Sequence, residues 1–217
     1  MSAIAIFLSP KILLMLMVSY KIEIYEDPLK LKESEFEDYF TTLPQERRAK
    51  VLNYRRKIDR NLSLLAYVLL RQGLHKWYGI EQNEFLRFEY NQYAKPSLAD
   101  YPHIYFNISH CQEAVVCVFA DQPIGVDVEG VIEYDEDLVR YVANADEYIV
   151  IANAKDLSLA FTNLWTKKES YMKMIGTGLD DDLHSVLNAL IETEIYFEHI
   201  YSQEKKYVLC VCTIATI

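Results

Sequence analysis

The chain lacks the features that mark several large classes of protein. Its 217 residues include 22 basic and 32 acidic side chains, which give a formal net charge of −10. Non-specific nucleic-acid binding needs a basic surface, so the charge argues against a nucleic-acid partner. The apolar run 12–18 is too short to cross a bilayer, and no small-residue cleavage site follows it. We therefore predict a cytoplasmic protein with no membrane anchor.

The four cysteines lack the spacing of a zinc site. Cys210 and Cys212 are two residues apart in a strand-like run, so they share a face but do not form a C-x-x-C pair. Reduced, semi-buried thiols are the interpretation that we favour. The sequence also lacks short repeats, low-complexity tracts and flexible linkers, and its 51% hydrophobic residues can form a substantial core.

The order of predicted elements favours an α+β fold. Hydrophobic periodicity predicts strands at 20–25, 85–90, 104–109, 114–120, 124–129, 195–201 and 207–216, and helices at 45–54, 62–78, 135–152 and 158–176. Strands, helices and strands recur twice, which indicates two similar lobes with antiparallel sheets. We assign 17–115 to the first lobe and 116–217 to the second. Residues 1–16 precede a second methionine, Met17, and are interpreted as an extension.

Two acidic side chains share one face of the strand predicted at 124–129. Asp127 and Glu129 are two residues apart, so both carboxylates point away from the apolar residues between and before them. Adjacent like charges repel, and a divalent cation removes that repulsion. Mg²⁺ takes oxygen ligands and leaves positions for water and phosphate. The alternative is an ordinary solvated strand face.

The predicted helix 158–176 carries a second group of charges. Glu169 and Lys173 are one turn apart at the edge of an apolar stripe, and an i,i+4 pair of this kind can be purely structural. Lys168 falls near the middle of that stripe, where an ammonium group needs an anionic partner.

Several further side chains could bind phosphate. A hydroxyl and an imidazole end the strand at 104–109, a lysine fixed by a proline lies in the loop after residue 90, and a basic helix begins near residue 45. The residues concerned are Ser109 and His110, Lys95 and Pro96, and Arg47 and Lys50. A structural histidine and a solvated helix face are the alternatives.

Taken together and in order, these motifs resemble the surfactin-type 4′-phosphopantetheinyl transferase family. The matching segments are A-K-P at 94–96, F-N-I-S-H at 106–110, G-V-D-V-E at 125–129, W-T-K-K-E-S-Y-M-K at 165–173 and G-T-G-L at 176–179. The resemblance runs from about Met17 to the C-terminus. It implies two pseudo-symmetric α+β lobes with the active site between them.

The resemblance also implies an activity. Such enzymes move the phosphopantetheine arm of coenzyme A onto a serine of a carrier protein and release adenosine 3′,5′-bisphosphate. By this resemblance Asp127, Glu129 and Glu169 hold Mg²⁺, and Lys173 binds the phosphate being transferred. Glu169, or a metal-bound water that it orients, is our candidate for the base.

The remaining matched positions are assigned to coenzyme A. The adenosine 3′-phosphate is expected to be held by Lys95, Ser109 and His110, with Pro96 shaping the pocket and Arg47 and Lys50 contacting the same phosphate. We expect a monomer, since one chain supplies both lobes. The carrier protein is left open among fatty-acid, polyketide and nonribosomal-peptide synthesis.

The sequence departs from the family pattern in three places. Ala94 stands where glycine is usual, Cys111 where serine is common, and Val142 to Asn144 where Phe-Ser is usual. None is a proposed metal ligand. Two other hypotheses remain at this point: a non-catalytic module that binds coenzyme A or a nucleotide, and a structural protein whose motifs coincide by chance.

Overall fold

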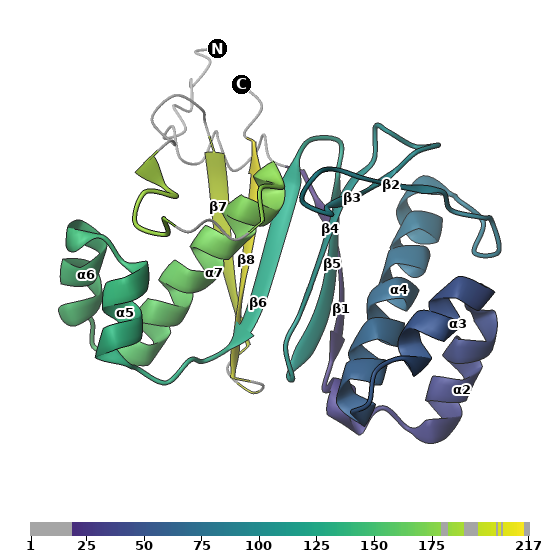
Figure 1. Cartoon of the computed structure of the whole chain (residues 1–217), viewed down its shortest axis with the longest axis horizontal. Helices are drawn as coiled ribbons and strands as arrows, with labels where there is room; N and C mark the ends of the chain where they lie inside the picture. The colour runs from purple at the N-terminus through teal and green to yellow at the C-terminus, as the bar shows by residue number, and fades with distance from the viewer. Residues whose placement is uncertain (1–18, 179–181, 189–194, 203, 205, 215–217) are drawn as a thin grey trace, which may run out of the picture.

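The protein is built in four layers, helix, sheet, sheet and helix. A computed structural model describes residues 19–178, 182–188, 195–202, 204 and 206–214. Figure 1 shows the helices of the first lobe on one side, with α4 (Lys57–Tyr78) nearest the sheets, then two three-stranded sheets side by side, then α7 (Leu157–Ile175) against the second sheet. The predicted α+β class with antiparallel sheets is confirmed. The predicted extension 1–16 lies outside the described residues.

The first lobe contains most of the small helices. Its elements are β1 (Lys21–Glu26), η1 (Pro28–Lys30), α2 (Glu33–Thr42), α3 (Gln45–Leu52), α4 (Lys57–Tyr78), β2 (Phe88–Tyr90), β3 (Pro96–Leu98), β4 (Tyr105–His110) and β5 (Ala114–Ala120). The second lobe contains β6 (Ile124–Gly130), α5 (Glu136–Val142), α6 (Ala145–Ala152), α7 (Leu157–Ile175), β7 (Ile195–Ser202) and β8 (Tyr207–Ile214).

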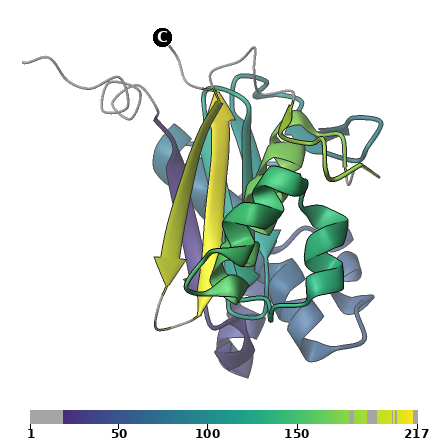
Figure 2. The same ribbon diagram turned by 90° about the vertical axis from the view of Figure 1, so that its left-hand side faces the viewer.

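The two lobes repeat one arrangement. The sheet order is β1-β5-β4 in the first lobe and β6-β8-β7 in the second, so in each case the last strand of the lobe lies in the middle. In each lobe the long helix covers the outer face of the sheet. Figure 2 shows α5, α6 and α7 together on one side of the β7–β8 pair. This repetition agrees with the two similar lobes that the sequence predicts.

Strand β5 is buried on both faces, which explains its unbroken apolar sequence. Val115, Cys117 and Phe119 pack into the core beneath α4, whereas Val116 and Val118 pack against the second sheet. Burial on both faces removes the need for polar alternation. The boundary predicted at 115–116 falls inside this strand, and the chain passes to the second sheet in the turn at 121–123.

The structure differs from the predicted elements in several places, and one of them is the 3₁₀-helix η1, which was not predicted. Helix α2 and strand β3 were not predicted: α2 has only one buried side chain, Phe36, and β3 is three residues long. The helix predicted at 135–152 is two helices, because Asn144 starts α6 with a reciprocal capping box that involves Glu147. In the described part of the chain no helix is long and apolar enough to cross a membrane.

Strand β6 and helix α7 touch at Gly125. A Cβ atom there would overlap the Ser170 carbonyl oxygen and the Met174 nitrogen. Both atoms belong to helix backbone, so relief requires the helix and the strand to separate. We expect Gly125→Ala to lower the free energy of unfolding by about 3 kcal/mol, measured by urea denaturation.

A matched variant separates this clash from backbone strain. Gly79 has a φ of 68°, and a Cβ added there meets open space. Gly79→Ala should therefore cost only about 1–2 kcal/mol, from the left-handed conformation alone. Equal destabilisation by the two substitutions would contradict a steric role for Gly125.

Candidate active site

Strand β4 divides the site into two halves by the alternation of its side chains. Phe106, Ile108 and His110 line a cavity of about 640 Å³ in the first lobe. Asn107 and Ser109 point to the other side, where their side-chain oxygens accept hydrogen bonds from the Val126 and Val128 amides of β6, at 3.0 and 3.3 Å. The side chains of this short strand therefore line the cavity on one face and contact the second lobe on the other.

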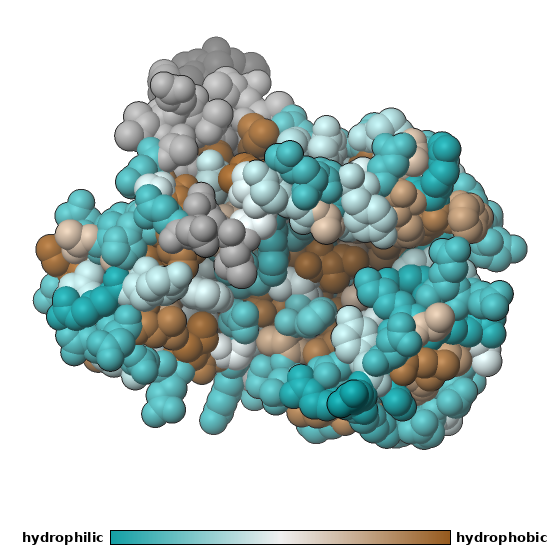
Figure 3. Space-filling view, in the orientation of Figure 1, coloured by the Kyte–Doolittle hydropathy of each residue, from teal (hydrophilic) through white to brown (hydrophobic). Residues whose placement is uncertain are grey.

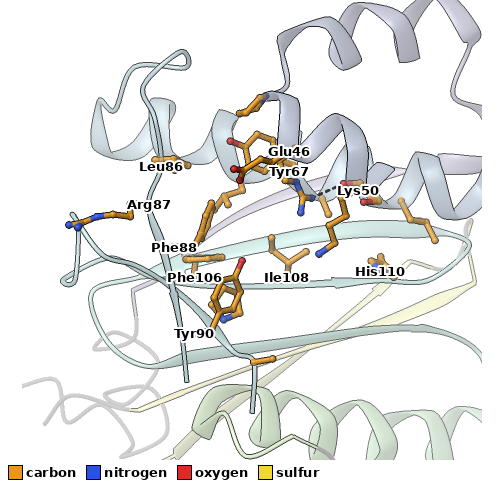
Figure 4. A pocket seen from close by; sticks show the side chains of 18 of the residues that line it. Glu46, Lys50, Tyr67, Leu86, Arg87, Phe88, Tyr90, Phe106, Ile108 and His110 are labelled. Carbon is orange, nitrogen blue, oxygen red and sulfur yellow. Dashed lines mark hydrogen bonds between the residues drawn. The ribbon is translucent and has the colours of Figure 1, made fainter. Parts of the chain in front are cut away.

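The cavity lies between α3 and α4 on one side and β2, β3 and β4 on the other. Figure 3 shows it as a hollow in the right-hand lobe, with apolar atoms on its floor. Phe88, Tyr90 and Tyr67 contribute rings to its walls, and Pro96 lines it from β3. In Figure 4 the Lys50 ammonium points into the cavity toward β4, near His110, whereas Arg87 points away. The cavity thus combines flat apolar walls with cationic groups.

Arg47 is held at the edge of this cavity by the helix beside it. Its guanidinium lies 4.9 Å from the centre of the Tyr67 ring and donates a 3.2 Å hydrogen bond to the Ser63 carbonyl. Burial lowers the pKa of Arg47. The buried Nε atom has no hydrogen-bond partner among the described residues. An anion would give this donor a partner.

His110 connects the cavity to the second half of the site. Burial lowers the pKa of His110, its own backbone raises it, and the Lys173 ammonium lowers it further. The cavity therefore ends where the charges of the second lobe begin.

The second half is an acidic cluster closed by a lysine. Asp127 is buried, and its Oδ1 accepts hydrogen bonds from the Lys173 ammonium at 2.5 Å and the Ser109 hydroxyl at 2.9 Å. The other oxygen, Oδ2, is buried without a partner among the described residues. Strand β6 supplies the aspartate and α7 supplies the lysine, so the contact in which Gly125 takes part determines this geometry.

Two glutamates flank Asp127. Burial, together with the nearby Asp127 charge, raises the pKa of Glu129 to about 7. Burial also raises the pKa of Glu169, while Lys173 lowers it. As arranged in the described part of the chain, no three acidic, histidine or cysteine side chains form a ready metal cluster. The unpartnered Oδ2 and two carboxyls that resist ionisation nevertheless fit a cation with oxygen ligands.

Comparison with known proteins identifies the family to which this chain belongs. Residues 30–122 match the model of the 4′-phosphopantetheinyl transferase N-terminal domain, and residues 123–212 match the 4′-phosphopantetheinyl transferase superfamily. The 4′-phosphopantetheinyl transferase Sfp of Bacillus subtilis is 33% identical over 157 residues, 71% of this chain and 70% of its own. This chain belongs to the 4′-phosphopantetheinyl transferase superfamily. The family and enzyme class predicted from the motifs are confirmed.

Other transferases of the superfamily match over similar lengths. The 4′-phosphopantetheinyl transferase gsp of Aneurinibacillus migulanus is 33% identical over 82% of this chain and 74% of its own. The L-aminoadipate-semialdehyde dehydrogenase-phosphopantetheinyl transferase of Saccharomyces cerevisiae is 31% identical over 76% of this chain and 64% of its own. The two matched family models meet between residues 122 and 123, in the turn that joins the two sheets of this transferase.

The transferase brings most of its predicted site residues together, in two groups. Arg47, Lys50, Pro96 and His110 line the cavity. The acidic trio Asp127, Glu129 and Glu169 gathers with Lys173 and Ser109 at the junction of the lobes. Ser109 was predicted as a phosphate ligand, yet its hydroxyl is already engaged with Asp127 and Lys173.

Lys95 lies apart from both groups. It does not line the cavity, and its ammonium donates a 2.6 Å hydrogen bond to the Met174 carbonyl at the end of α7. Burial lowers the pKa of Lys95 to about 8. Its predicted contact with a phosphate stays a prediction.

Sequence reasoning missed the aromatic walls of the cavity. Tyr67 lies on α4, one turn after Ser63, and Phe88 and Tyr90 alternate on β2. The chain has seventeen tyrosines, so the residue type alone is no signal. The i,i+2 spacing of Phe88 and Tyr90 in front of the A-K-P motif was the available signal.

The raised pKa of Glu129 predicts a pH dependence. Asp127, Glu169, Lys173 and Trp165 are the groups that act on this carboxyl. Its pKa is about 7 in the fold against an ordinary value of 4.5, so between these values the unfolded state binds fewer protons than the folded state. Stability of the metal-free protein therefore falls as pH rises through this window.

Thermal unfolding of Glu129→Gln in a metal chelator measures this effect. We expect the melting temperature of the variant to rise relative to the parent as pH is raised through that window, because the glutamine never ionises. The exposed Glu133 provides the control, since Glu133→Gln should leave a constant difference. A constant difference for Glu129→Gln as well would argue against the raised pKa.

Proposed function

We propose that this transferase moves the 4′-phosphopantetheine group of coenzyme A onto a serine of an apo carrier protein, with Mg²⁺ held by Asp127, Glu129 and Glu169. The observation that carries the proposal is the adjacency of the two half-sites along β4. A cationic, aromatic cavity ends at His110, and the acidic cluster with Lys173 begins one residue away at Ser109. Such a pair suits a substrate with a nucleoside at one end and a pyrophosphate in its middle.

The cavity suits the adenosine end of coenzyme A. Phe88 and Tyr90 offer flat surfaces for the base. Lys50, His110 and the unpartnered Nε of Arg47 offer donors for the 3′-phosphate. The adenosine 3′-phosphate is therefore assigned to these three side chains.

The acidic cluster suits Mg²⁺. Asp127 Oδ2 needs a partner, and the repulsion among Asp127, Glu129 and Glu169 disappears once a dication lies among them. Bound there, Mg²⁺ would neutralise charge on the pyrophosphate. Lys173 is next to Asp127, so its ammonium can contact the phosphate being transferred.

Beyond charge neutralisation, the transfer requires that the serine and the phosphate are aligned and that a base is present. The serine oxygen forms a bond to the phosphorus on the pantetheine side, and the bond from that phosphorus to the bridging oxygen breaks. Adenosine 3′,5′-bisphosphate leaves, and the serine proton passes to a base. We assign the base to Glu169, since burial raises its pKa toward that of a useful proton acceptor.

Compartment and assembly form part of the same proposal. All four cysteines are free thiols, which supports a reducing compartment such as the cytoplasm. One chain supplies both half-sites, which supports a monomer. The net charge of −10 argues against nucleic acid as a partner.

The test is a transfer reaction with coenzyme A, Mg²⁺ and apo carrier proteins from fatty-acid, polyketide and nonribosomal-peptide systems. Intact mass spectrometry should show the addition of one phosphopantetheine group to at least one carrier. Tight binding of coenzyme A without any transfer would instead identify a non-catalytic binding module.

A further inference from the structure

The loop between β2 and β3 is organised by one side chain, Asn91. Its Oδ1 accepts hydrogen bonds from the Tyr93 and Lys95 amides, both at 2.9 Å. Two backbone hydrogen bonds close the loop. The Asn91 amide donates to the Lys95 carbonyl, and the Ala94 amide donates to the Asn91 carbonyl. Ala94 has a φ of 63°, a left-handed conformation that is unfavourable for alanine. The loop therefore holds a defined, strained shape.

This loop reaches the second lobe and forms hydrogen bonds with the C-terminal end of α7. Lys95 Nζ donates to the Met174 carbonyl at 2.6 Å, and Asn91 Nδ2 donates to the Gly176 carbonyl at 2.8 Å. The last carbonyls of a helix lack intrahelical partners and carry the negative end of its dipole. A partly buried ammonium group is well suited to that position.

The fit leaves no room for a side chain at the helix end. Gly176 ends α7 with a φ of 76°, and a Cβ there would lie 2.8 Å from Lys95 Cδ and 2.9 Å from Asn91 Nδ2. The helix end and the loop are thus in close contact. The two hydrogen bonds to Met174 and Gly176 are called the inter-lobe latch below.

We propose that Asn91 and Lys95 are positioning residues that fix the cavity wall relative to the catalytic face of α7. The neighbours of the loop, Tyr90 and Pro96, line the cavity, and Lys173 precedes the latched carbonyl by one residue. The latch thus joins the site of the adenosine end to the site of the reacting phosphate. This inference rests on the proposed function, and it gives Lys95 a role other than binding the 3′-phosphate.

Positioning and phosphate binding make different predictions for Lys95→Met. This substitution removes one of the two latch hydrogen bonds and no cavity contact, so the dissociation constant for coenzyme A, measured by calorimetry, should change less than about threefold. Transfer should instead become slower, with kcat reduced about tenfold. The reason is that the cavity wall that binds the substrate no longer keeps a fixed position relative to α7. The same kcat loss is expected with 3′-dephospho-coenzyme A, which lacks the 3′-phosphate.

Three further variants sharpen the test. Lys95→Arg keeps a donor for the Met174 carbonyl and should recover most of kcat. Asn91→Ala should reduce kcat about threefold, since Asn91 is exposed and its bonds are weaker. Asn91→Asp keeps acceptors for the Tyr93 and Lys95 amides but cannot donate to Gly176, so it should slow transfer while the loop stays ordered.

Hydrogen exchange gives a readout that needs no transfer reaction. The Tyr93 and Lys95 amides should exchange faster in Asn91→Ala than in the parent, and remain protected in Asn91→Asp. If the parent shows no transfer to any carrier, the proposed function fails. The exchange measurement then still tests whether Asn91 orders the loop. Weaker binding of coenzyme A by Lys95→Met, absent with the dephospho substrate, would overturn the latch in favour of a phosphate contact. Unchanged exchange in Asn91→Ala would overturn it as well.

Discussion

Replacing Asp127 by Asn is expected to reduce transfer by about 10²–10³-fold, the usual effect of removing one preorganised electrostatic group. Asp127 is buried, and it is the carboxylate on which Lys173 and Ser109 converge. An amide of the same shape cannot offer two anionic oxygens. Mg²⁺ should therefore bind more weakly, and the Lys173 ammonium should be less well oriented. Initial rates at saturating coenzyme A and a titration with Mg²⁺ measure the effect.

An exposed acidic residue provides the control for this substitution. Asp121 lies in the turn between β5 and β6, on the same chain segment but outside both half-sites. Asp121→Asn should leave kcat and the Mg²⁺ dependence unchanged. Full activity of Asp127→Asn with an unaltered Mg²⁺ dependence would refute the assignment of Asp127 as a metal ligand.

The largest loss of stability is expected from Lys168→Met. Lys168 is 1% exposed, and its ammonium donates to Glu147 Oε2 at 2.6 Å and to the Val142 and Leu183 carbonyls at 2.9 and 2.7 Å. Removing one partner of a buried ion pair leaves the other unpaired and destabilises by about 3–5 kcal/mol. For a chain of this size that corresponds to a fall in melting temperature of roughly 6–20 °C.

The neighbouring lysine on the same helix is the matched control. The Lys167 ammonium lies 4.8 Å from the centre of the Phe197 ring and is only partly buried. Lys167→Met should therefore destabilise by only about 0.5–1 kcal/mol. If the two methionine variants unfolded at the same temperature, the three hydrogen bonds of Lys168 would have no special role.

The local motifs predicted most of what depends on short-range periodicity. Asp127 and Glu129 share a strand face because side chains alternate along a strand, and Gly125 on the same face meets α7. The continuous apolar run of β5 predicted a central buried strand, and β5 lies between β1 and β4. The helix that carries Glu169 and Lys173 was predicted from its apolar stripe to within a residue or two at each end.

Contacts between distant segments were beyond that reasoning. The sequence indicated that Lys168 needs an anionic partner, but the choice of Glu147 depends on how α6 packs against α7. Likewise the A-K-P motif marked Lys95 as a cation in a loop, without saying that it meets the end of a helix from the other lobe. Sequence spacing contains no information about such pairs, which are separated by 21 and 79 residues.

The sequence alone determined the family, the α+β class and the carboxylates proposed as metal ligands, because these follow from residue types at fixed short spacings. Only the tertiary structure decided where the site is divided. The alternation of β4 sends His110 into the cavity and Ser109 to Asp127, and packing of β6 on α7 brings Lys173 to the same carboxylate. The physical reason is that a strand determines which of its own side chains share a face, whereas what that face meets depends on the whole fold.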